Sequence, residues 1–271
     1  MVNFKLVTLA VAILIDTAQS ASTAPLVDLD NGRFQGYSQG DLDYFLAIPY
    51  AASTGGNNRF RRPQPPLSVQ GVRNATTPGL TCPNISTLGD SSKTGEDCLY
   101  VNVYKPSDVK AGDNLPVMTD KSFILIRVVL DLRGYVHLIR NICSVDKEVF
   151  PTSAKSNGSS LLRASNNSII YVQVSYRVSA LGFLASQELQ EADGLNLGLW
   201  DQLYALEWVR TNIREFGGDP MKVTIFGESA GGISVAMHLL KQNDKRQLFR
   251  GAIIESGSPT SGVYPMYSYY Q

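Results

Sequence analysis

The pentapeptide Gly-Glu-Ser-Ala-Gly at 227–231 constrains the fold of this chain more than any other feature. It follows an apolar run at 223–226 and precedes a helical pattern at 232–240. A serine between a strand and a helix, with glycine two residues away on each side, is typical of the turn called the nucleophile elbow. Only small neighbours fit so sharp a turn, and the next helix points its free N–H groups at the reacting carbonyl. The pattern therefore predicts Ser229 as a nucleophile on a strand–turn–helix unit of an α/β fold.

A second match to the same spacing, Gly-Tyr-Ser-Gln-Gly at 36–40, lacks this context. It follows a turn and a short strand pattern, and the residues after it, at 41–44, have no helical period. The motif is confirmed only by a strand before it and a helix after it. We therefore assign the nucleophile to Ser229 and not to Ser38.

The composition describes an ordinary globular protein. The 271 residues are 44% hydrophobic and 18% charged, which is enough apolar sequence to bury a core. Lys+Arg and Asp+Glu both number 24, and no basic block is present, so neither nucleic acid nor an anionic membrane surface is indicated as a partner. Three cysteines and two histidines, widely scattered, make no metal-ligand set. We therefore expect no metal and no cofactor, and the sequence does not indicate an oligomeric state.

The N-terminus has the pattern of a secretory signal peptide. Lys5 precedes ten apolar or small residues at 6–15, which are followed by small and polar residues around a cleavage point. Ten residues are too few to span a bilayer, so we expect no transmembrane segment. A buried N-terminal strand is the alternative interpretation. We predict a signal peptide over residues 1–20, with cleavage after residue 20 or at 21–24, and therefore a secreted, extracellular protein.

Two other features fit the secretory route. Cys82 and Cys98 can close a short loop in an oxidising compartment, which stabilises a fold by roughly 3 kcal/mol in the chain-entropy model. Cys143 is then left over. Four Asn-x-Ser/Thr triplets, each a weak signal by itself, are candidate glycosylation sites: Asn74, Asn84, Asn157 and Asn166.

Apolar patterns and turn residues predict strands and helices along the chain. An Asn-Gly pair at 31–32 indicates a hairpin. Residues 51–97 are rich in Gly, Pro, Asn and Ser, which is typical of a long ordered loop on the surface. Strands are expected at 44–47, 99–104, 168–176, 223–226 and 251–254, and helices at 199–214 and 232–240.

Longer motifs give the chain a family resemblance. One is Glu-Asp-Cys-Leu-Tyr-Val-Asn-Val-Tyr-Lys-Pro at 96–106, and another, Phe-Gly-Gly-Asp-Pro at 216–220, extends the elbow towards the N-terminus. Supporting stretches are Asn-Leu-Gly-Leu-Trp-Asp-Gln at 196–202 and Tyr-Arg-Val-Ser-Ala-Leu-Gly-Phe at 176–183. With these motifs the chain resembles the type-B carboxylesterase/lipase family, the cholinesterase-like branch of the α/β-hydrolases.

The resemblance extends over about 25–118 and 158–260. It implies an α/β-hydrolase fold with a mostly parallel central sheet, of which residues 21–271 are the N-terminal part, truncated before the C-terminal half. It also implies hydrolysis of a carboxylic ester, of a small molecule or a lipid, through an acyl-enzyme and a Ser–His–Glu triad. Within that scheme Ala230 donates its backbone N–H to the oxyanion, and Cys82 and Cys98 form the N-terminal disulfide of the family.

The histidines depart from the family pattern, in which the triad acid and histidine follow the elbow in the C-terminal half. This chain has only His137 and His238. His238 lies nine residues along the helix from Ser229, roughly 13 Å up the axis and half a turn round. It cannot reach the hydroxyl, and we interpret it as a structural histidine. His137 lies in a stretch without a family counterpart.

That stretch, 119–155, is the second departure. In the family a strand here leads into a glycine-rich turn whose N–H groups bind the oxyanion. No Gly-Gly pair occurs between positions 56 and 217, and Cys143 lies inside the stretch. We hypothesise that 119–155 is a replaced segment, such as a read-through intron or a mis-spliced exon.

Both departures from the family pattern remove groups that ester hydrolysis needs. Without the histidine, the acid and the glycine-rich turn, the chain as written is expected to be nearly inactive. The alternative is a non-catalytic cholinesterase-like binding or adhesion module. The intact elbow around Ser229 favours the enzyme lineage.

Overall fold

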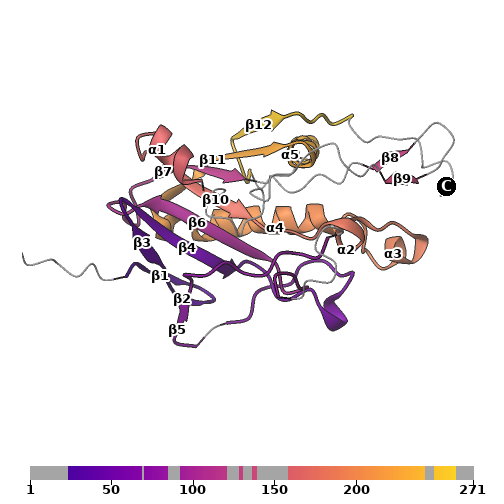
Figure 1. Cartoon of the computed structure of the whole chain (residues 1–271), viewed down its shortest axis with the longest axis horizontal. Coiled ribbons are helices and arrows are strands. Elements are labelled where there is room, and N and C mark those ends of the chain that lie inside the picture. The colour runs from indigo at the N-terminus through magenta and orange to yellow at the C-terminus, as the bar shows by residue number, and fades with distance from the viewer. Residues whose placement is uncertain are drawn as a thin grey trace, which may run out of the picture.

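The computed structural model of the chain describes residues 24–68, 70–84, 92–120, 128–130, 136–138, 158–241 and 247–260 (Figure 1). The predicted signal peptide at 1–20, Cys143 and most of the hypothesised replaced segment 119–155 lie outside these residues.

A seven-stranded sheet forms the centre of the fold (Figure 1). In spatial order its strands are β12 (Gly251–Glu255), β11 (Gly218–Glu228), β7 (Leu115–Asp120), β10 (Ile170–Val174), β6 (Tyr100–Pro106), β4 (Leu42–Pro49) and β3 (Tyr37–Gln39). Pairing is parallel from β12 to β10 and antiparallel from β10 to β3, so five strands (β12, β11, β7, β10 and β4) run one way and β6 and β3 run the other. The predicted α/β fold with a mostly parallel sheet is confirmed.

Two smaller sheets accompany the central one. A three-stranded sheet contains β1 (Leu26–Leu29), β2 (Gly32–Gln35) and β5 (Val72–Asn74), and Leu29 pairs with Gly32 across a tight turn. The predicted hairpin is therefore confirmed, with Asp30 and Asn31 as its two turn residues and Gly32 as the first residue of β2. The strands β8 (Val128–Leu130) and β9 (Val136–Leu138) pair antiparallel as a separate ribbon.

Two helices, α4 and α5, are longer than the other helices in the described part of the chain. The helices are α1 (Ser159–Ala164), α2 (Ser179–Phe183), α3 (Gln187–Glu191), α4 (Leu197–Asn212) and α5 (Ala230–Leu240), with 3-10 turns η1 (Gly56–Asn58) and η2 (Ile213–Phe216). Gly217 ends the α4–η2 unit at φ 88°, and a Cβ there would lie 2.4 Å from Val109 Cγ1. Only glycine fits this left-handed position, so the predicted helix at 199–214 ends where the sequence changes to Gly-Gly.

Apolar residues cover both faces of the central sheet. On one face Leu206 of α4 packs in a cluster with strand residues such as Val172. On the other, Tyr104 and Tyr171 stand in direct register across β6 and β10 and pack with Leu162 of α1. Side chains of a buried strand point alternately to the two faces, so helices are needed on each side.

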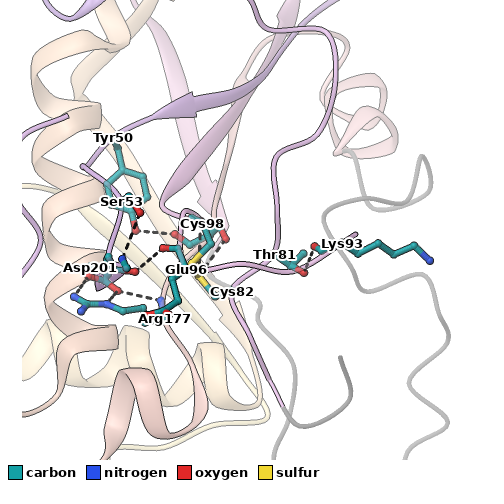
Figure 2. Close-up of a disulfide and its surroundings, with 12 residues drawn as sticks. Tyr50, Ser53, Thr81, Cys82, Lys93, Glu96, Cys98, Arg177 and Asp201 are labelled. Carbon is teal, nitrogen blue, oxygen red and sulfur yellow. Dashed lines mark hydrogen bonds and ion pairs between the residues drawn. A yellow bond between two sulfur atoms is a disulfide. The ribbon is translucent and has the colours of Figure 1, made fainter. Parts of the chain in front are cut away.

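A disulfide joins Cys82 to Cys98, directly before β6 (Figure 2). The two sulfur atoms are 2.02 Å apart, and both side chains are buried. Close by, the Tyr50 hydroxyl donates a hydrogen bond to the Ser175 carbonyl oxygen at 2.7 Å. The disulfide expected from the sequence is therefore present in the structure.

Removing this disulfide is expected to lower the free energy of unfolding by about 3 kcal/mol, because the open loop of the unfolded chain gains entropy. The measurement is urea unfolding of the wild type and of the double variant Cys82→Ala/Cys98→Ala. A reducing agent should destabilise the wild type and leave the double variant unchanged. Equal unfolding midpoints for the oxidised wild type and the double variant would contradict the expectation.

Ser179, the first residue of α2, is in a strained conformation. Its φ is 55°, a region that favours glycine, and its hydroxyl oxygen is buried without a hydrogen-bond partner. We expect Ser179→Gly to stabilise the fold by about 1 kcal/mol, because both penalties disappear.

The matched control for this change is Ser186→Gly. Ser186 caps α3 at φ −153° and accepts a hydrogen bond from the Leu189 N–H at 3.2 Å, so glycine there should destabilise slightly. Thermal unfolding of both variants measures the effect. A lower melting temperature for Ser179→Gly than for the wild type would refute the strain at Ser179.

Candidate active site

Ser229 lies between the last residue of β11 and the first residue of α5, at the junction seen in Figure 1. Its φ of 55° and ψ of −114° are unusual for any residue other than glycine. The Ser229 N–H donates to the Glu255 carbonyl at 2.8 Å, and the Ser229 carbonyl accepts from the Ile233 N–H at 2.9 Å. The strand–turn–helix context predicted for this serine is confirmed.

Glycines make the turn possible. A Cβ on Gly227 would lie 2.4 Å from the carbonyl carbon of Gly231, and a Cβ on Gly232 would lie 2.7 Å from the Glu255 carbonyl oxygen. Both distances are well inside van der Waals contact with backbone atoms, which cannot move aside as a flexible side chain can. Gly227 and Gly232 therefore let α5 pack directly on β11 and β12.

The turn stands at the carboxyl edge of the parallel strands. Phe226 of β11 is in register with Asp120, the last residue of β7, and Glu228 is in register with Glu255, the last residue of β12. Open α/β sheets place their ligands at this edge. Ser229 is partly exposed there.

The N-terminus of α5 faces the same position. The first N–H groups of a helix, beginning here with Ala230, have no acceptor inside the helix, and the helix dipole makes this end positive. The Ser229 side chain does not cap them. This arrangement can stabilise negative charge that develops on an oxygen next to Ser229.

The described side chains place no histidine in hydrogen-bond contact with Ser229. His238 of α5 is 6% exposed, and its Nε2 is 2.9 Å from Gln202 Oε1 on α4. The structural interpretation of His238 is therefore confirmed. His137 belongs to β9, but its side chain lies outside the described part of the structure.

Ser38 stands in a different environment, as its sequence context predicted. It belongs to the edge strand β3, and the next element is the strand β4. Its hydroxyl donates to Asp43 Oδ1 at 2.7 Å. No helix N-terminus follows it.

A polar network beside the elbow was missed by the sequence analysis. Gln202, Ser234 and His238 form a hydrogen-bonded chain between α4 and α5, and the Ser234 hydroxyl donates to the Ala230 carbonyl at 3.0 Å. Ser234 follows Ala230 by one helical turn, so helix geometry alone could have suggested that contact. The partner on α4 had no signal in the sequence.

The candidate glycosylation sites differ in exposure. Asn74 and Asn166 are exposed, while Asn157 lies outside the described residues. Asn84 is 3% exposed, and because a glycan must project into solvent, this burial makes the triplet at Asn84 a poor acceptor. The sequence triplet carries no information on exposure.

Metal-binding groups and membrane-spanning helices are both absent from the described residues. Those residues contain no group of three His, Cys, Asp or Glu side chains that could hold a metal ion. They also contain no helix that is both long enough and apolar enough to cross a bilayer.

Comparisons with known proteins agree with one another. A model of the Carboxylesterase family matches residues 23–119 and 146–268. The chain is 38% identical over 241 residues to the para-nitrobenzyl esterase of Bacillus subtilis (strain 168), covering 87% of this chain and 44% of that protein. It is 33% identical over 292 residues to secreted lipase 1 of Botryotinia fuckeliana (strain B05.10), covering 94% and 47%. The solved structure of Aspergillus niger EstA matches with a TM-score of 0.72 and 36% identity, covering 85% of this chain and 41% of that one. The chain spans less than half the length of these three relatives.

Proposed function

Since the chain belongs to the carboxylesterase family, we propose that it is part of a secreted carboxylic ester hydrolase in which Ser229 is the nucleophile. The observation that carries the proposal is the conformation of Ser229, with its positive φ between β11 and α5 at the carboxyl edge of the sheet. Such a turn holds a serine hydroxyl forward of the backbone, next to free helix N–H groups.

The proposed reaction proceeds through an acyl-enzyme. Ser229 Oγ attacks the carbonyl carbon of an ester while a base takes the hydroxyl proton. The carbonyl oxygen becomes negative and is stabilised by the N–H of Ala230 at the start of α5. The alcohol then leaves with a proton, and water hydrolyses the acyl group on Ser229 to release the acid.

The base and its carboxylate partner are the groups that the described residues do not supply. His238 is bonded to Gln202 between two helices and does not face the hydroxyl. We propose that the complete enzyme contributes a histidine and an acid from sequence beyond this chain, and that the chain alone is nearly inactive. The partial coverage of its relatives, 44% and 47%, supports this proposal.

A replaced segment within 119–155 remains our proposal, and the family match limits it to 120–145. The family model matches up to residue 119 and again from residue 146, so 120–145 have no counterpart in it. In the family, a strand at this position leads into the glycine-rich turn of the oxyanion site. We propose that the native message joins the two matched parts through such a turn.

Secretion of the protein is likewise proposed. The buried disulfide between Cys82 and Cys98 supports an oxidising compartment, and one relative bears the name of a secreted lipase. The predicted signal peptide at 1–20 supplies the route. We propose carboxylic esters as the substrate class.

The function is tested with the protein encoded by the sequenced transcript. We expect an in-frame histidine and acid downstream of the elbow, and hydrolysis of p-nitrophenyl esters by the encoded protein. Ser229→Ala should lower kcat by a factor on the order of 10⁶, and Ser38→Ala, the second serine with the same spacing, should leave it unchanged. A folded product whose hydrolysis survives Ser229→Ala would refute the nucleophile.

A non-catalytic binding or adhesion module is the second candidate. The described side chains favour it in one respect, because His238, the histidine among them, bonds Gln202 and not Ser229. An uninterrupted message for 119–155, with no histidine and acid downstream, would support this module over the enzyme.

A further inference from the structure

A buried polar network connects α4 to the first turn of α5. Gln202 on α4 is fully buried, and Ser234 and His238 on α5 are each 6% exposed. Gln202 Nε2 is 3.1 Å from Ser234 Oγ, and Gln202 Oε1 is 2.9 Å from His238 Nε2. Buried polar groups of this kind cost free energy unless they are hydrogen-bonded, and here each amide atom of Gln202 has a partner.

The Ser234 hydroxyl both accepts and donates a hydrogen bond. A serine hydroxyl has one proton to donate and two lone pairs to accept with. The proton is directed to the Ala230 carbonyl oxygen at 3.0 Å, and Gln202 Nε2 donates to one lone pair. Gln202 thus holds the Ser234 hydroxyl, and Ser234 donates its own hydrogen bond to the Ala230 carbonyl.

This arrangement fixes the orientation of the other side chains. The amide nitrogen of Gln202 must face Ser234, so its carbonyl oxygen must face His238. An amide oxygen can only accept, and therefore His238 carries a proton on Nε2.

We propose that Gln202 is a positioning residue for the oxyanion donor of the elbow. Through Ser234, Gln202 fixes the position of the Ala230 carbonyl. Ala230 is also the residue whose backbone N–H is proposed to bind the oxyanion. Helix ends fray because their first turns lack partners, and this bond ties the first turn of α5 to the packed interior between two helices. The inference rests on the proposed function, because Ala230 matters to catalysis only if Ser229 is the nucleophile.

Selective isotope labelling isolates the relevant peptide group. Ala followed directly by Gly occurs only twice in the sequence, at Ala111–Gly112 and at Ala230–Gly231. Labelling alanine carbonyls with ¹³C and glycine amides with ¹⁵N gives one cross-peak for each pair in a carbonyl–amide correlation spectrum. The Ala230 carbonyl resonance reports the hydrogen bonds that this carbonyl accepts, and the pair at 111–112 is an internal control.

Three variants of the 271-residue chain distinguish the hydrogen bonds that lead from Gln202 to Ala230 from the bond between Gln202 and His238. Ser234→Ala removes the bond to Ala230 directly. Gln202→Glu keeps an acceptor for His238 but has no N–H to donate to Ser234, and Gln202→Leu removes both bonds. Gln187→Leu is the matched control, because Gln187 Nε2 donates to Glu191 Oε1 on the surface of α3 at 3.0 Å.

We expect the Ala230–Gly231 cross-peak to move in all three network variants and the Ala111–Gly112 cross-peak to stay fixed. Gln187→Leu should move neither, and Gln202→Glu should keep the proton on His238 Nε2 in an imidazole ¹⁵N spectrum. If Gln202→Leu does not fold, Gln202→Glu still decides. A cross-peak that moves in Ser234→Ala but not in Gln202→Glu would overturn the positioning role, because Gln202 would then be only a packing residue.

Kinetics of the complete gene product separate this inference from the proposed function. In an active enzyme Gln202→Glu should lower kcat roughly ten-fold with KM unchanged, since a displaced oxyanion donor weakens transition-state binding. An active wild type with an unaffected Gln202→Glu variant refutes the positioning role alone. An inactive wild type refutes the proposed function, and the carbonyl spectrum still decides whether Gln202 holds Ala230.

Discussion

The 271-residue chain is expected to hydrolyse p-nitrophenyl esters no faster than its own Ser229→Ala variant. Ser229 has the φ and ψ of the proposed elbow, but its hydroxyl would need a base to act as a nucleophile. Loss of a catalytic histidine costs roughly 10⁶ in kcat. The neighbouring helix N-terminus cannot replace the base, because it supplies donors and accepts no proton. Steady-state release of p-nitrophenol, measured for both purified proteins at equal concentration, tests this expectation.

His238 provides the matched control for this result. Because His238 bonds Gln202 in the interior, His238→Gln should change the stability of the chain and leave its hydrolysis rate at the same low level. A wild-type rate about 100-fold or more above that of Ser229→Ala would contradict the expectation. A rate that also fell in His238→Gln would show that this histidine does act as the base.

Breaking the ion pair between Arg177 and Asp201 is expected to cost about 3–5 kcal/mol of folding free energy. Arg177 is 2% exposed and Asp201 is fully buried, and Figure 2 shows the two side chains facing each other. Arg177 Nε is 2.8 Å from Asp201 Oδ2, and Arg177 Nη2 is 2.6 Å from Asp201 Oδ1, a bidentate pair. Arg177→Met removes the cation and leaves a buried carboxylate without its charge partner. Urea unfolding at pH 7 measures the loss.

The dependence of this loss on pH follows from Asp201. Burial raises the pKa of Asp201, and the hydrogen bonds and charge of Arg177 oppose that rise. Without Arg177 the pKa rises further, so the folded variant binds a proton more tightly than the unfolded chain does. Stability of the variant is therefore retained below the unfolded pKa of an aspartate and lost as the pH rises, and the deficit should be larger at pH 7 than near pH 4.

The exposed pair of Arg33 and Asp28 supplies the control for the ion pair. Their side chains are 51% and 66% exposed, and water screens such a pair strongly. Arg33→Met should leave the unfolding midpoint unchanged. An Arg177→Met variant as stable as Arg33→Met would refute the structural role of the buried pair.

Local patterns predicted the parts of the fold that short-range chemistry decides. The elbow at Ser229 needs small residues next to it, and the hairpin between β1 and β2 needs turn-forming residues such as Asn31, so both were visible in the sequence. Cys82 and Cys98, which form the disulfide, are only 16 positions apart in the sequence, so their pairing could be expected from the sequence. The central strands were visible as apolar runs because they are buried on both faces.

Features that depend on tertiary packing were not predictable in the same way. The bond from Gln202 to His238 joins residues 36 positions apart on two helices, and no local period indicates it. The burial of Asn84 depends on what packs around it and not on the triplet that it begins. Ser179 shows the same limit, since its strained φ becomes apparent only when the turn before α2 is built.

Labelling with a fluorophosphonate tests the central claim most directly. The probe forms a covalent bond to an activated serine, and mass spectrometry of the digested protein locates the adduct. For the folded protein encoded by the sequenced transcript we predict an adduct on the peptide that contains Ser229, absent in Ser229→Ala and retained in Ser38→Ala. A folded protein that stays unlabelled, or an adduct on any other serine, would contradict the assignment of this turn as the catalytic elbow of an ester hydrolase.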